Sequence, residues 1–134
     1  MTATALAWGI GLGAAVAVFA SRIGFDRDRS FYPTVLMVIA AYYVLFAVML
    51  GNERAILIET GVAALFSIAS IIGYRWSALI VAAAIFAHGV YDAAHHLVFP
   101  DHGAPSWWPG FCGSIDIVLA IAAVLAVRKR KKAS

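Results

Sequence analysis

Residues 31–50 read FYPTVLMVIAAYYVLFAVML, a run of twenty residues without one charged side chain. Because a helix rises about 1.5 Å per residue, such a run is about 30 Å long, which matches the hydrocarbon thickness of a bilayer. Further apolar segments of similar length occur at about 3–20, 54–72, 76–99 and 107–127. The sequence therefore predicts an all-α, polytopic membrane helix bundle with five transmembrane helices, in which residues 1–134 form a single integral membrane domain.

Composition supports this fold class. Of the 134 residues, 63% are hydrophobic and 13% are charged, too few polar side chains to cover a water-soluble domain. The first apolar segment has no basic region before it, so a spanning helix is expected there instead of a cleaved signal peptide. The chain has one cysteine, Cys112, which excludes an intramolecular disulfide and any metal motif built from several cysteines of one chain.

The basic residues predict the orientation. If the RKRKK run at 128–132 lies in the cytoplasm, five crossings place nine of the ten Lys and Arg residues inside and only Arg54 outside. This positive-inside bias predicts an N-terminus outside and a C-terminus inside, in a bacterial-type cytoplasmic cell membrane that the chain crosses several times. The net charge of +3 thus has a topological explanation, and we expect the lipid bilayer as a partner and no nucleic acid.

The stretch HGVYDAAHH at 88–96 interrupts the fourth apolar segment with polar residues. At about 100° per residue, His88, Asp92 and His95 project from one side of a helix, with His96 at the margin of the same stripe. In the predicted orientation this stripe lies in the outer leaflet and faces the protein interior.

Other ionisable residues fall at a similar depth. Glu59 lies about 8 Å and Asp116 about 13 Å below the outer surface, from their distances to the predicted helix starts. Tyr42 and Tyr43 lie in the same half of the membrane. Since polar groups at membrane depth normally face a partner or a water-filled cavity, these residues predict one pocket that opens to the outside.

A metal site is the first interpretation of this pocket. His88, Asp92, His95 and His96 would hold a divalent ion, with zinc or iron favoured by imidazole and carboxylate ligands. Glu59 and Asp116 would complete the ligand shell, or act as catalytic base in a metal-dependent membrane enzyme that acts on a hydrophobic small molecule. Cys112 fits either a ligand or a buried packing residue.

Two alternatives remain open. The same residues suit a small proton- or cation-coupled transporter, in which Glu59, Asp92 and Asp116 titrate. They also suit a non-catalytic subunit or scaffold, in which buried hydrogen bonds fix the helix register. Taken singly, His96 and His102 also fit solvated interface positions.

Haem and nucleotide are not expected as cofactors. The three membrane histidines share one helix, so a second axial haem ligand is missing, and GIGLG at 9–13 lacks the strand and the full glycine pattern of a nucleotide loop. Gly9, Gly13 and Ala17 recur every fourth residue, which is the spacing of close helix packing and is compatible with a homodimer.

The motif H-x-x-Y-D-x-x-H-H, followed by P-x-W-W-P-x-F-C and an aspartate four residues later, resembles a family of small bacterial multi-spanning membrane proteins of unknown function. The specific part of the likeness runs from Ala87 to Asp116. The resemblance implies a multi-spanning fold and brings no assigned activity.

Overall fold

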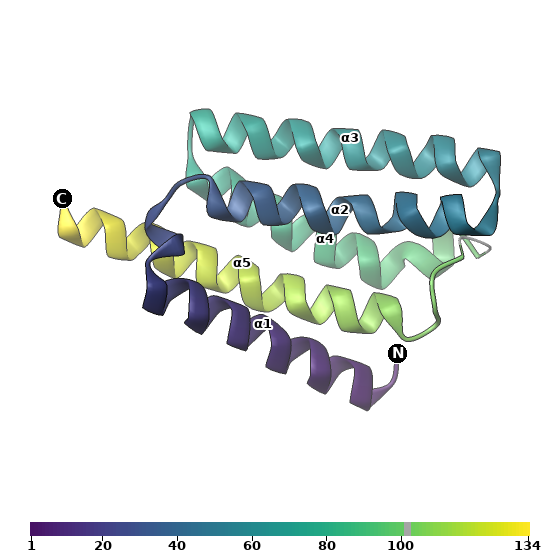
Figure 1. Cartoon of the computed structure of the whole chain (residues 1–134), viewed down its shortest axis with the longest axis horizontal. Coiled ribbons are helices and arrows are strands. Elements are labelled where there is room, and N and C mark those ends of the chain that lie inside the picture. The colour runs from purple at the N-terminus through teal and green to yellow at the C-terminus, as the bar shows by residue number, and fades with distance from the viewer. Residues whose placement is uncertain (101–102) are drawn as a thin grey trace.

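The computed structural model describes residues 1–100 and 103–134. Asp101 and His102 lie outside the described residues, and so does the solvated position predicted for His102. Figure 1 shows the elements, which are α1 (Ala3–Ile23), a short 3-10 helix η1 (Phe25–Arg27), α2 (Phe31–Leu50), α3 (Glu53–Arg75), α4 (Ala78–Val98) and α5 (Trp108–Ala133). The five α-helices are all long and apolar enough to cross a membrane. The prediction of an all-α protein with five membrane-length helices is confirmed.

The helices run alternately in opposite directions. Figure 1 shows α3, α2, α5 and α1 in a row, with α4 behind α2. The contacts between elements agree, because α5 packs mainly on α4 and α1, α2 packs on α3, and α4 also contacts α3 and α2. The C-terminal half of α4 is therefore placed where it can face α2, α3 and α5 together.

Local sequence signals set the helix ends. Gly24 and Gly51 adopt left-handed backbone conformations (φ 92° and 72°), which end α1 and α2 without the strain that a side chain would add. α5 continues to Ala133, six residues past its apolar stretch, where Arg130 donates to the carbonyl oxygen of Asp26 at 2.8 Å. Between η1 and α2, hydrogen bonds from Ser30 lower the pKa of the Asp28 carboxyl below its usual value.

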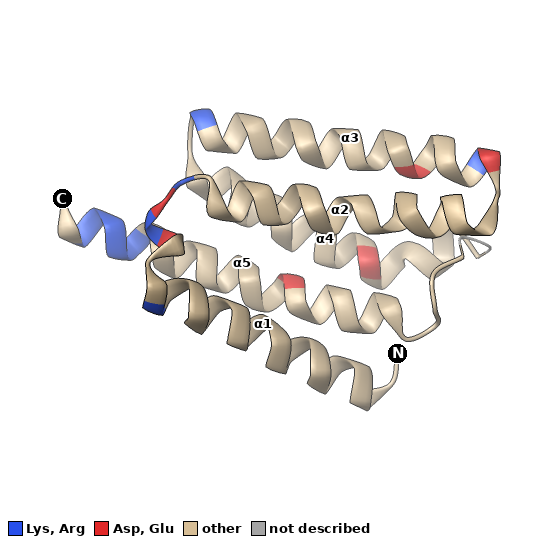
Figure 2. Cartoon of the chain, viewed as in Figure 1, with Lys and Arg blue, Asp and Glu red and all other residues tan. Residues whose placement is uncertain are grey.

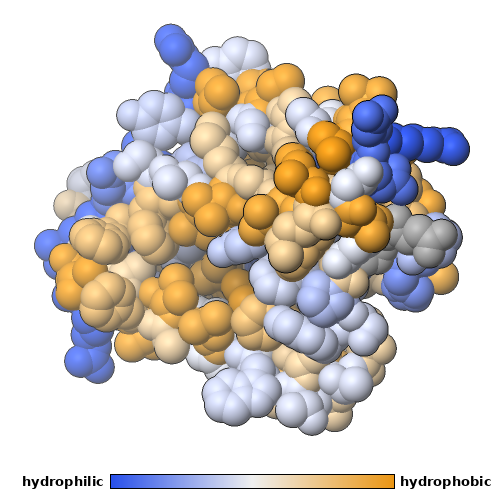
Figure 3. Space-filling view, turned by 45° about the vertical axis from the view of Figure 1, so that its right-hand side comes forward, coloured by the Kyte–Doolittle hydropathy of each residue, from blue (hydrophilic) through white to orange (hydrophobic). Residues whose placement is uncertain are grey.

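The outward faces of the helices are apolar. Large side chains such as Leu57, Phe19 and Leu97 are 75%, 61% and 76% exposed, which would be unfavourable against water over so many positions. Figure 3 shows apolar residues across the middle of one face and strongly hydrophilic residues at its margins, and Figure 2 shows basic residues gathered mainly at one end of the bundle. The apolar helices imply contact with a lipid bilayer, and the protein is a multi-pass membrane protein.

The small residues of α1 contact α5 of the same chain. A Cβ atom added to Gly9 would clash with Ser114 Oγ and with the carbonyl oxygen of Phe111, and one on Gly13 would lie 3.1 Å from Val118 Cβ. The spacing therefore marks a close approach of two helices, as predicted. Since α5 occupies this surface, the glycine stripe supplies no argument for a homodimer.

The half of the bundle next to η1 has an apolar core. Its buried side chains include Leu36 and Ile39 of α2, Ile85 of α4 and Leu119 of α5. The buried Ser70 of α3 donates to the carbonyl oxygen of Pro33 at 2.6 Å, so its hydroxyl is satisfied. The buried ionisable side chains of α3, α4 and α5 lie instead in the opposite half, nearer the α2–α3 turn, where Figure 2 shows acidic positions within these helices.

Candidate metal centre

Four potential ligands meet between α4 and α5. His88 and Asp92 are one helical turn apart on α4, and Cys112 and Asp116 are one turn apart on α5. All four are buried, with exposed fractions between 0% and 3%, and one potential ligand atom from each lies within 4.8 Å of the others. We call these residues the four-residue cluster.

Two glycines allow α4 and α5 to approach closely at this point. A Cβ atom on Gly89 would lie 3.0 Å from Asp116 Cβ and 3.2 Å from the carbonyl oxygen of Gly113. One on Gly113 would lie 3.2 Å from the carbonyl oxygen of Gly89 and 3.3 Å from Asp92 Cβ. Any larger residue would separate the helices, so both glycines help to bring the ligands of the two helices together.

The polar atoms of the cluster are only partly satisfied. His88 Nδ1 lies 2.7 Å from Asp116 Oδ2 and 3.6 Å from Asp92 Oδ2. Within the described residues, His88 Nε2, both carboxylate oxygens of Asp92 and Asp116 Oδ1 have no hydrogen-bond partner. Buried polar atoms without a hydrogen bond are costly in an apolar environment, so these atoms are available to coordinate a cation.

The donor set suits a divalent cation. Around a tetrahedral ion with bonds of about 2.1 Å, neighbouring ligand atoms are about 3.4 Å apart, and thiolate bonds are about 0.2 Å longer. The observed separations bracket this value, from 2.7 Å between His88 and Asp116 to a maximum of 4.8 Å. These separations are compatible with one nitrogen, two oxygens and one sulfur around a single ion.

A second polar group lies one helical turn further along α4. His95 Nε2 lies 2.7 Å from Glu59 Oε1, and Tyr91 donates a hydrogen bond of 2.9 Å to Glu59 Oε2. The His95 ring stacks on the Tyr43 ring, with centroids 3.9 Å apart and an angle of 9°. We call Glu59 and His95 the Glu59–His95 pair; both are buried, with exposed fractions of 2% and 0%.

The structure divides the predicted pocket residues. It brings His88, Asp92 and Asp116 together, while His95 contacts Glu59, which is the other predicted catalytic carboxylate. His96 is exposed, and Tyr42 lies outside the polar groups with its ring against Trp108. The ligand and catalytic roles of these residues stay predictions.

Cys112, for which the sequence allowed either a ligand or a packing role, belongs to the four-residue cluster. The sequence does carry a signal for it, because Cys112 and Asp116 repeat on α5 the four-residue spacing of His88 and Asp92 on α4. Two such pairs on neighbouring antiparallel helices form a four-ligand site when their faces meet. Which faces meet is a property of the tertiary structure.

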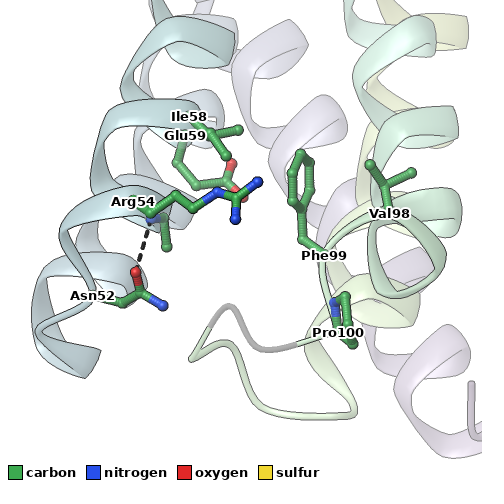
Figure 4. Close-up of a pocket in the computed structure, with 8 residues that line it drawn as sticks. Asn52, Arg54, Ile58, Glu59, Val98, Phe99 and Pro100 are labelled. Carbon is green, nitrogen blue, oxygen red and sulfur yellow. Dashed lines mark hydrogen bonds between the residues drawn. The ribbon is translucent and has the colours of Figure 1, made fainter.

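A cavity of about 270 Å³ opens beside the Glu59–His95 pair. Figure 4 shows it between the start of α3 and the end of α4, with the Arg54 side chain pointing across the opening towards Phe99. Asn52, Arg54 and Glu59 give it polar lining, and Asn52 Oδ1 accepts a hydrogen bond from the backbone of Ala55 at 3.1 Å. Glu59 thus connects this opening with the buried histidine.

Fold and site together define a class, a multi-pass membrane protein with a buried histidine, aspartate and cysteine group that could hold a metal ion. Comparison with protein-family models, with curated proteins and with solved structures found no match to this chain. The five apolar helices and the buried cluster agree with the resemblance to small multi-spanning membrane proteins, and the family itself stays a prediction.

Proposed function

We propose that this chain is a metal-binding integral membrane protein whose four-residue cluster holds one divalent cation. The observation that carries the proposal is the meeting of four buried ligand atoms within 4.8 Å, several of them without a partner among the described residues. A cation would balance the negative charge of the two aspartates in this apolar setting.

Zinc is the favoured ion. A mixed set of imidazole, carboxylate and thiolate suits zinc, and the thiolate disfavours magnesium, calcium and manganese, which prefer oxygen ligands. Iron, the other predicted metal, accepts the same nitrogen and oxygen donors. In this proposal Asp116 acts as a ligand, and the catalytic role of Glu59 stays a prediction.

Metal content after purification tests the proposal. Protein incubated with zinc and freed of excess ion should retain about one zinc per chain, whereas a double variant, His88→Ala with Asp92→Ala, should retain none. His96→Ala is the matched control, because this exposed histidine lies on the same helix outside the cluster. Wild-type protein that stays folded and binds no zinc would contradict the proposal.

A metal-dependent enzyme acting on a membrane-resident molecule is the second candidate. The observation that favours it is an apolar groove of about 470 Å³, whose lining includes Gly89 and Gly113. Gly89 packs against Asp116 and Gly113 packs against Asp92, so the groove lies next to the cluster. Mass spectrometry of native lipids incubated with the zinc-loaded protein should then reveal a product that the double variant does not form; equal lipid profiles would refute the enzyme.

We further propose the orientation that the basic residues predict, with the C-terminus in the cytoplasm. The gathering of basic residues at one end of the bundle supports it. The cluster and the Glu59–His95 pair then lie in the outer half of a bacterial-type cytoplasmic membrane.

A further inference from the structure

The four-residue cluster has no exposed side of its own. Its members are at most 3% exposed, so an ion in water cannot reach them without passing other residues. How a cation would arrive is therefore a separate question from whether it binds. The surroundings of the cluster differ strongly in polarity from one side to another.

Towards η1 the surroundings are apolar. The side chains of Ile85 and Leu119 belong to the buried apolar core that fills this half of the bundle. Towards the lipid, the groove beside Gly89 and Gly113 is lined by residues such as Val90 and Ile117. To cross either the apolar core or the lining of this groove, a divalent ion would have to lose most of its hydration water, at a cost of many kcal/mol.

Towards the α2–α3 turn the surroundings are polar. Glu59 lines the 270 Å³ cavity and contacts His95 at 2.7 Å. His95 is three residues from Asp92 on α4, a rise of about 4.5 Å. The Tyr43 ring stacks on His95, and its centroid lies 6.4 Å from that of His88, so Tyr43 bridges the Glu59–His95 pair and the cluster.

We propose that cations reach the four-residue cluster through this cavity, and that Glu59 takes the ion from water before His95 and Asp92 pass it inward. The route rests on the proposed function. Carboxylate and imidazole groups can replace part of the hydration shell of the ion at each step, which the apolar surroundings cannot do. The exchange occurs at one face of the membrane, since the apolar core closes the other half.

Arg54 controls the approach to Glu59. Its side chain lines the same cavity as Glu59 and points across the opening towards Phe99 in Figure 4, and it is the only Lys or Arg in the sequence between Arg29 and Arg75. Its positive charge repels an incoming cation, while the negative charge of Glu59 attracts it. The two residues therefore have opposite effects on the rate of uptake and little effect on the final bound state.

Rates of cobalt uptake test the route. Purified full-length protein in detergent is mixed rapidly with Co²⁺, and binding is followed by the visible absorption of the protein-bound ion; its affinity is measured at equilibrium. Glu59→Gln should slow both uptake and release by about tenfold or more and leave the dissociation constant nearly unchanged. Arg54→Gln, at an exposed position that need not affect folding, should accelerate uptake by several-fold.

Glu53→Gln is the matched control, because Glu53 is an exposed acidic residue at the same end of α3 that does not line the cavity. Unchanged uptake rates in Glu59→Gln and Arg54→Gln would overturn the route while leaving the metal site intact. Equal slowing by Glu53→Gln would overturn it too, because surface charge alone would then explain the rates. A wild-type protein that binds no cobalt and no zinc would refute the proposed function, and the route with it.

Discussion

The close approach of α4 and α5 predicts that a single methyl group at Gly89 will weaken metal binding. In Gly89→Ala the new Cβ would start 3.0 Å from Asp116 Cβ and 3.2 Å from the Gly113 carbonyl oxygen, whereas ordinary contacts begin at 3.4 Å. α5 must therefore retreat by a few tenths of an ångström. Asp116 would move away from His88 and Asp92 by the same amount.

The magnitude follows from two opposing effects. Overpacking of a tight contact costs about 1–3 kcal/mol, while replacing glycine by alanine inside a helix gains about 1 kcal/mol. Gly11→Ala isolates the second effect, because a Cβ on Gly11 meets nothing within 4 Å. We therefore expect Gly89→Ala to be less stable than Gly11→Ala by about 1–3 kcal/mol. Its zinc affinity should fall about tenfold for each 1.4 kcal/mol of binding energy that the displaced ligands lose.

Two measurements on both variants check this prediction. Unfolding of the purified protein in detergent, followed by helical circular dichroism, gives the stability difference, and calorimetric titration with zinc gives the affinity. If Gly89→Ala matches Gly11→Ala in both stability and affinity, the contact between α4 and α5 does not position the ligands, and the reasoning is refuted.

Three further predictions concern other parts of the chain. Cys112→Ser should reduce zinc affinity by about tenfold or more, because a hydroxyl replaces the soft thiolate ligand. The same change should remove the thiolate-to-metal absorption of the cobalt form. An unchanged cobalt spectrum would show that the thiol is a packing group. Ser70→Ala should destabilise the apolar half by about 0.5–1.5 kcal/mol, since the Pro33 carbonyl loses its 2.6 Å hydrogen bond. Unfolding curves measure this loss, and the control is Ser67→Ala, a partly buried serine one turn earlier on α3; an equal loss there would contradict the prediction. A fluorescent reporter that matures only in the cytoplasm, fused after Ser134, should fluoresce in intact cells, whereas a dark fusion at normal expression would reverse the proposed orientation.

The sequence alone was sufficient for the helices of this protein. Each segment is apolar over enough residues to cross a bilayer, and in that solvent the backbone must satisfy its own hydrogen bonds, which leaves the helix as the default. Length and composition are local properties, so the number of spans could be read from runs such as 31–50. The helix ends were less well predicted, because α5 continues through the charged run to Ala133.

The polar stripe was also visible in the sequence, since residues four apart share a helix face whatever the tertiary structure. That rule placed His88 and Asp92 on one face, and the rise per residue placed Glu59 and Asp116 at a similar depth. It could not assign partners, because depth along a helix says nothing about rotation around its axis.

Only the tertiary structure decided which faces meet. The glycines at 89 and 113 let α4 and α5 approach until Cys112 and Asp116 join His88 and Asp92, while α3 presents Glu59 to His95 instead. One predicted pocket thus became a buried four-residue cluster and a separate pair at a cavity. The physical reason is that helix periodicity is set within a segment, whereas rotation and spacing between helices are set by side-chain packing across the whole bundle.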